Sequence, residues 1–102
     1  MQVLRRFAMG PLADARLTVV VDRPVAVYSG MVPGYVAGQY ARHELEIDVR
    51  PLARRAGARV VVAAATGVDA ARARIELDGR APLAYDTASL DVGSRIAGCD
   101  VP

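Results

Sequence analysis

The apolar residues of this 102-residue chain fall into short runs that are interrupted by Pro, Gly and Asp. Leu17–Val21 and Arg59–Ala65 are too short for helices, rich in Val and apolar on both faces, which is typical of strands buried in a parallel sheet. Asp22 and Pro24 end the first run, and Thr66-Gly67 is predicted to end the second. Thr87–Val92 is predicted as the last strand, which Gly93-Ser94 stops.

A helical pattern occupies two other segments. Gln2–Met9 places its apolar residues at the i, i+1, i+4 and i+5 positions of one helical face, and Gly10-Pro11 ends it. The second helix begins after Asp48, a favourable N-cap, carries Pro51 in its first turn and ends at Gly57. Its predicted buried stripe consists of Val49, Leu52, Ala53 and Ala56.

The remaining segments give weaker signals. Met31–Tyr40 is predicted as a short helix or, equally, as a flexible loop, because Pro33, Gly34 and Gly38 interrupt it. Asp78-Gly79 is a tight-turn signal between Ala73–Leu77 and Pro82–Tyr85, and it predicts a β-hairpin. A strand, a helix and a strand in this order favour a right-handed parallel unit. Residues 1–102 are therefore predicted to form one α/β domain with a hairpin insertion.

Composition narrows the class of protein. The hydrophobic share is 53%, and no run approaches the ~20 apolar residues of a membrane span or forms a signal peptide. We therefore expect a soluble protein. Cys99 is the only cysteine, which suits a cytoplasmic protein and excludes an intrachain disulfide. All 13 basic residues are Arg and lie among 11 acids, so nucleic-acid binding is not expected despite a pI near 9.1.

Candidate binding residues lie at predicted strand ends. Asp22 follows a buried strand, which is where open α/β sheets bind ligands, although this run by itself favours a solvated strand-end carboxylate. Gly67 and Gly93 also follow predicted strands directly, and each could be an ordinary turn glycine. If the three strands are parallel, Asp22 and the two glycines lie at one edge of one sheet.

The sequence shows no self-contained catalytic set. His43 is the only histidine, so neither a histidine-rich metal site nor a triad can be assembled around it. Ser29 lies outside any nucleophile-elbow pattern, and Cys99 is interpreted as an incidental thiol. Arg54 and Arg55 are interpreted as a solvated helix face rather than an anion site. We predict no metal site and no catalytic residue in this chain.

The order of the segments resembles the FAD-binding domain of the pyridine nucleotide-disulfide oxidoreductase superfamily, in its NADH dehydrogenase-like branch. The resemblance rests on the segments VVVD at 19–22, YSGMVPGYVAGQY at 28–40, IDVRPLARRAGARVVVAAATGVD at 47–69, IELDGR at 75–80 and AYDTASLDVGS at 84–94. The 28–40 stretch resembles the subgroup associated with selenide, water dikinase. The resemblance covers nearly the whole chain and rests on the order and spacing of motifs that are individually only moderately specific.

The resemblance implies roles for particular residues. Asp22 would hold the adenosine ribose of FAD, the backbone around Ala65 would meet the adenine, and Gly93 would lie near the pyrophosphate. Ser29, Gly30 and Pro33 match a segment that passes close to the flavin. The 28–46 stretch contains no cysteine, which favours a dehydrogenase that uses NADH or NADPH without a redox-active dithiol.

The family's Gly-rich fingerprint and first strand would precede Gln2, so the resemblance implies a truncated, Rossmann-like FAD-binding domain. Such a chain is expected to be a segment of a FAD-dependent oxidoreductase, inactive alone, that binds FAD weakly or not at all. A non-catalytic interaction or assembly module is the alternative. Unpaired apolar strand edges also predict that the chain forms homo-oligomers.

Overall fold

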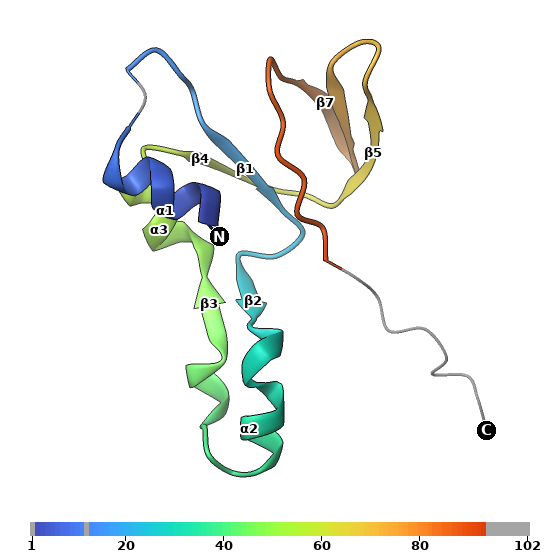
Figure 1. Ribbon diagram of the computed structural model, residues 1–102. Coiled ribbons are helices and arrows are strands. Elements are labelled where there is room, and N and C mark those ends of the chain that lie inside the picture. The colour runs from blue at the N-terminus through green and yellow to red at the C-terminus, as the bar shows by residue number, and fades with distance from the viewer. Residues whose placement is uncertain (1, 12, 94–102) are drawn as a thin grey trace, which may run out of the picture.

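A computed structural model, which describes residues 2–11 and 13–93, shows a mixed α/β chain with parallel and antiparallel pairing (Figure 1). Strands β1 (Thr18–Val21) and β4 (Arg59–Val62) form a parallel pair, with Val20 opposite Val61. Helices α1 (Gln2–Met9) and α3 (Val49–Arg55) lie together beside this pair. The predicted helix 2–9, the predicted first strand and its parallel partner are therefore confirmed.

The main core lies between the two helices and the parallel pair. Leu4 of α1, Val49 of α3 and Ala56 after it form the buried cluster and are 4%, 6% and 7% exposed. The partly buried residues packed against this cluster are Phe7, Ala8, Leu17, Val19, Val21, Leu52, Ala58 and Val60. Alternate residues of β1 thus face the helices, as the pleat of a strand requires. The predicted stripe of α3 is confirmed, with Leu52 only half-buried.

Helix α3 begins and ends where the sequence predicts. The carboxylate of Asp48 accepts a hydrogen bond from the backbone N–H of Arg50 at 2.9 Å, which satisfies a donor in the first turn. At the other end Gly57 adopts a φ of 65°, and the N–H of Ala58 donates to the carbonyl of Ala53 at 2.8 Å. This geometry favours glycine because a Cβ would be strained in the left-handed region.

An antiparallel sheet follows the parallel pair and consists of β5 (Ala65–Asp69), β6 (Arg74–Leu77) and β7 (Arg80–Ala84). The predicted hairpin is confirmed, because Leu77 pairs with Arg80 across the turn at Asp78-Gly79. The predicted break at Thr66-Gly67 is wrong. The buried strand ends at Val62 instead. Residues 66 and 67 lie inside β5, where Gly67 pairs with Glu76 of β6 and Thr66 lies at a register shift.

The predicted strand Thr87–Val92 is also wrong. This stretch has no regular secondary structure, and Leu90 and Val92 are 61% and 85% exposed. An apolar run becomes a strand only where a neighbouring strand accepts its backbone hydrogen bonds. Among residues 2–11 and 13–93 no strand pairs with this stretch. The described chain accordingly has one parallel pair where the sequence predicted three parallel strands.

Residues 25–48 form an arm that projects away from the two helices (Figure 1). Its base is an antiparallel pair of β2 (Val25–Val27) and β3 (Glu46–Asp48). Its end holds three single-turn or short helices, η1 (Ser29–Met31), α2 (Val32–Val36) and η2 (Arg42–Glu44). The short helix predicted for 31–40 is thus present, but it is only five residues long. The strands β2 and β3 were not predicted.

The arm is stabilised by a few close contacts. Leu45 is 3% exposed, and its carbonyl accepts a hydrogen bond from the N–H of Tyr28 at 2.8 Å. Gly34 lies directly against the ring of Tyr40, where an added Cβ would come within 2.5 Å of Cε2. A glycine at position 34 therefore allows the ring to pack on the backbone.

Candidate functional site

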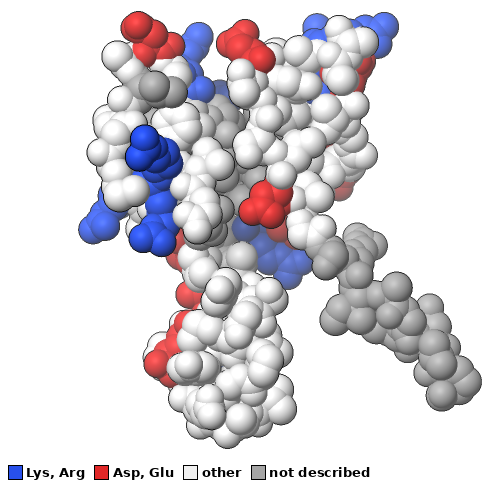
Figure 2. Space-filling model, in the orientation of Figure 1, with Lys and Arg blue, Asp and Glu red and all other residues white. Residues whose placement is uncertain are grey.

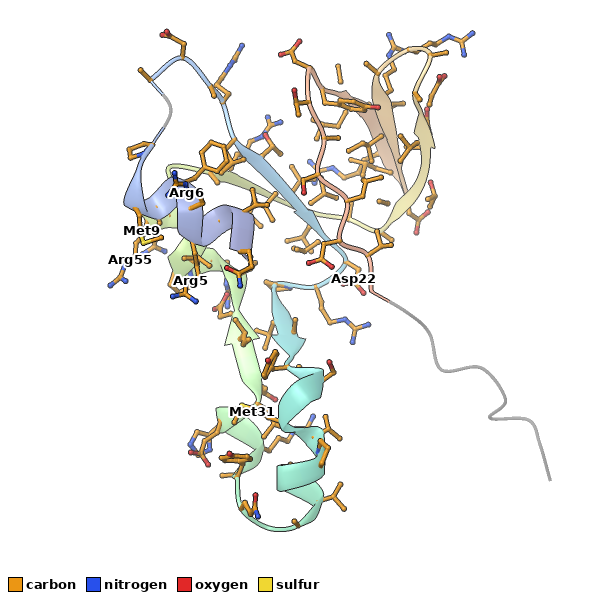
Figure 3. All side chains as sticks on the ribbon, in the orientation of Figure 1. Arg5, Arg6, Met9, Asp22, Met31 and Arg55 are labelled. Carbon is orange, nitrogen blue, oxygen red and sulfur yellow. The ribbon has the colours of Figure 1, made fainter. Side chains whose placement is uncertain are left out.

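Asp22 lies immediately after β1, at the carboxyl end of the parallel pair (Figure 3). Its Oδ2 accepts hydrogen bonds from Nε and Nη2 of Arg23 at 3.2 and 3.1 Å. The side chains of Asp22 and Arg23 are 60% and 73% exposed. An ion pair between such exposed neighbours is weak, so the carboxylate can exchange Arg23 for another hydrogen-bond donor at little cost.

The connection from β4 to β5 lies at the same end of the parallel pair. Val21 is opposite Val62, and the N–H of Ala63 donates to the carbonyl of Val21 at 2.9 Å. Ala65 then begins β5 and is exposed. The structure therefore brings Asp22 and the backbone of residues 63–65 to one sheet edge. Such an edge can offer a carboxylate acceptor and strand-end backbone groups to a polar ligand.

Neither glycine directly follows a strand of the parallel pair, contrary to the prediction. Gly67 lies within β5, close to the register shift opposite β6, where an added Cβ would be 3.8 Å from Glu76. Gly93 has a φ of 69° and is exposed, but no strand precedes it. Of the three residues that were predicted to follow parallel strands, only Asp22 does so.

Ser29, Gly30 and Pro33 lie together on the arm rather than beside Asp22. Ser29 and Gly30 belong to η1, and Pro33 lies in the first turn of α2. All three residues are exposed. Sequence reasoning missed a shallow apolar hollow of about 240 Å³ in the same arm, which is lined by Val27, Val32, Tyr35, Arg42 and Leu45. Three of the chain's four tyrosines fall within residues 28–40, and this concentration of aromatic residues is the sequence feature that could have indicated the hollow.

Two other carboxylates are held by local arginines. Hydrogen bonds from the Arg50 side chain, the shortest at 2.7 Å, lower the pKa of Asp48 below its usual range. The side chain and backbone of Arg72 likewise lower the pKa of Asp69, with Nη1 2.9 Å from Oδ2. Both carboxylates stabilise local structure, one at a helix start and the other at the turn after β5.

Within residues 2–11 and 13–93 no group of three or more His, Cys, Asp or Glu side chains could hold a metal ion. His43 lies in η2 and is exposed, and Cys99 lies outside the described residues. In the same part of the chain no helix is long and apolar enough to cross a membrane.

On the face shown in Figure 2 a group of arginines lies over the two helices, and further basic groups lie at the antiparallel sheet and in the middle of the molecule. On this face the arm shows mainly uncharged residues, with acids on one flank. Arg5 and Arg6 of α1 and Arg55 of α3 surround exposed Met9 in Figure 3. Within the described residues none of these arginines forms an ion pair. Arg54 and Arg55 are exposed, as expected for a solvated helix face.

The fold is similar to part of a known structure. The sulfide:quinone oxidoreductase from the hyperthermophilic bacterium Aquifex aeolicus superimposes with a TM-score of 0.68 over 82% of this chain, at 16% sequence identity. The chain spans about a fifth of that protein's length, since the match covers 20% of it. No protein-family model matches the sequence, and neither does any curated protein. The likeness therefore concerns the fold.

Proposed function

We propose that this chain is a segment of a FAD-dependent oxidoreductase in which it positions the adenosine half of FAD. The observation that carries the proposal is the exposed carboxylate of Asp22 at the carboxyl end of β1, within a fold similar to part of a sulfide:quinone oxidoreductase. Strand-end carboxylates of this kind accept hydrogen bonds from ribose hydroxyls. Because the ion pair with Arg23 is exposed, Asp22 is free to accept them.

The residues present fit the ribose end of the cofactor. Asp22 would accept the ribose hydroxyls, and the backbone at 63–65 shares its sheet edge and would border the adenine. Gly93 is proposed to approach the pyrophosphate, and Ser29, Gly30 and Pro33 to face the flavin side. When bound, FAD would supply the redox chemistry, with NADH or NADPH as the hydride donor. The chain's own residues bind and orient the cofactor.

The test is a titration of the ¹⁵N-labelled chain with FAD, because NMR detects weak binding. We expect the amide signals of Asp22 and residues 63–65 to shift, whereas most other amides stay in place. Asp22→Ala should abolish these shifts. Asp69→Ala, which removes another carboxylate of a strand end, should preserve them. Equal loss in both variants, or shifts that fall outside the sheet edge, contradicts the proposal.

A non-catalytic interaction module is the second candidate, and the exposed apolar surface of the arm favours it. Val27, Tyr28, Tyr35 and Val36 are 59%, 54%, 43% and 78% exposed. Contiguous apolar surfaces of this kind commonly mark interaction sites. Purification of a full-length parent protein that contains this segment separates the two candidates: retained flavin absorbance supports the oxidoreductase, and a colourless parent that flavin does not reconstitute supports the module.

A further inference from the structure

We propose that the outer face of α1 and α3 binds the surface of an anionic lipid bilayer. This basic helix face consists of Arg5 and Arg6 of α1, Arg54 and Arg55 of α3, and Met9. All five residues are exposed. In Figure 3 Arg5, Arg6 and Arg55 lie around Met9, and Figure 2 shows the arginines grouped over the two helices. The proposal is independent of flavin binding.

The positive charge of this face is not neutralised by acids of the same helices. Neither α1, with the sequence QVLRRFAM, nor α3, with the sequence VRPLARR, contains Asp or Glu. Within the described residues none of the four arginines forms an ion pair, whereas Arg50, in the first turn of α3, is bound by Asp48. The whole chain has 13 basic and 11 acidic residues, so the excess of positive charge here is local. Such a face attracts an anionic partner.

The basic helix face points away from the sheet, so its exposure does not depend on what lies at the sheet edges. Leu4 of α1 and Val49 of α3 are buried in the core, where Val19 of β1 packs against them. The arginines occupy the opposite side of each helix, as the helical period requires. A strand added at either edge of the parallel pair would lie in the layer of the sheet, and it would leave the outer side of the helices uncovered.

The composition of this face favours a bilayer over an acidic protein as the partner. A stable protein interface buries about 800 Å² on each partner around an apolar core. Met9, which is 73% exposed, is the single apolar member of the basic helix face, so the face lacks such a core. A bilayer does not require one, because each basic residue near an anionic surface strengthens binding about fivefold. The flexible side chain of Met9 can enter the boundary between headgroups and acyl chains.

The first test is co-sedimentation of the chain with vesicles at low salt. We expect binding to vesicles of phosphatidylglycerol and phosphatidylcholine in equal parts, and none to phosphatidylcholine alone. Arg5→Gln/Arg55→Gln should lower the partition coefficient about twentyfold, since each neutralised arginine costs about fivefold. The matched control Arg74→Gln/Arg80→Gln alters two exposed arginines of the antiparallel sheet and lowers the net charge equally, yet it should bind like the unaltered chain. No binding to anionic vesicles, the result if an acidic protein is the partner, or an equal loss in both variants overturns the proposal.

The second test identifies the face that contacts the bilayer. The chain contains no Trp, so Met9→Trp introduces a single fluorescent reporter into the basic helix face. When anionic vesicles are added, we expect its emission to shift to shorter wavelength and to be quenched by lipids with brominated acyl chains. Val36→Trp places the same reporter at an exposed apolar position of the arm, where neither change should occur. Quenching at position 36 that equals or exceeds quenching at position 9 would show that the arm binds the bilayer, which overturns the proposal.

Discussion

At the scale of single residues, Asp48 joins three parts of the structure. It ends β3, caps α3 through the N–H of Arg50 and binds the Arg50 guanidinium. A seven-residue helix is too short to be stable by itself, so its cap and its packing together decide whether it forms. The sequence predicted this cap because Asp, Pro and Gly occupy the positions that a helix start and end require. The ion pair with Arg50 follows from the same local geometry.

Replacing this cap should lower the stability of the whole chain. We expect Asp48→Ala to reduce the melting temperature by about 5 °C, because the first turn of α3 then has an unsatisfied donor. Asp48→Asn keeps an acceptor oxygen and should lose less. Thermal unfolding followed by circular dichroism at neutral pH measures both, with Asp86→Ala as the exposed control. Identical melting temperatures for Asp48→Ala and the unaltered chain would rule out this role.

The lowered pKa values of Asp48 and Asp69 predict an acid-dependent loss of stability. Both carboxyls have a pKa below the usual 3.8 in the folded chain because Arg50 and Arg72 donate hydrogen bonds to them. Their stabilising contribution is therefore present above pH 4 and disappears as the pH falls through the lowered values. Urea unfolding at several pH values should show a smaller acid loss in the Asp48→Asn/Asp69→Asn variant. An unchanged pH dependence contradicts the prediction.

At the scale of elements, the local sequence pattern predicted the helices and turns whose stabilising partners lie close in the sequence. The helices at 2–9 and 49–55 and the turn at Asp78-Gly79 carry their own caps or turn residues. The strand at 87–92 failed because its pattern required a partner that the described chain does not supply. The short strands β2 and β3 had no signal of their own, since three residues are too few for a period to be recognised.

Strand β4 offers a matched pair of positions for testing its orientation. Val61 is 8% exposed and the adjacent Val62 is 48% exposed. Val61→Asp should therefore destabilise the chain by an amount on the order of 3 kcal/mol or more, enough to unfold it, because the carboxylate would be buried without a partner. Val62→Asp should leave a cooperative transition. Denaturation by urea measures both, and a similar midpoint for the two variants would show that the assigned faces are wrong.

At the scale of the whole molecule, the described chain is more extended than its length requires. Its radius of gyration is 16.1 Å, whereas a compact domain of this size has about 13 Å. Figure 1 shows the reason, because the arm and the antiparallel sheet project from a small central core. Sequence patterns could indicate which residues are apolar. They could not indicate this separation, which depends on contacts between segments far apart in the chain.

The uneven distribution of buried residues along the chain predicts uneven protection of its amides from hydrogen exchange. Amides in α3 and β4 should exchange slowest, because Val49, Ala53 and Val61 bury these elements. Amides in the arm should exchange at least tenfold faster, since Leu45 is its main buried residue. Exchange followed by NMR or mass spectrometry measures both rates in one sample. Equal protection of the arm and of α3 would show that the chain unfolds as one unit.

The base of the arm has an evolutionary consequence. The N–H of Val49 donates to the carbonyl of Pro24 at 2.9 Å, so the chain leaves the core and returns to it at nearly the same point. A segment whose two ends are adjacent can be lengthened, shortened or exchanged without altering the elements on either side. Residues 25–48 are thus an exchangeable unit, and changes of length or sequence can accumulate there in evolution while α1, β1, α3 and β4 are retained.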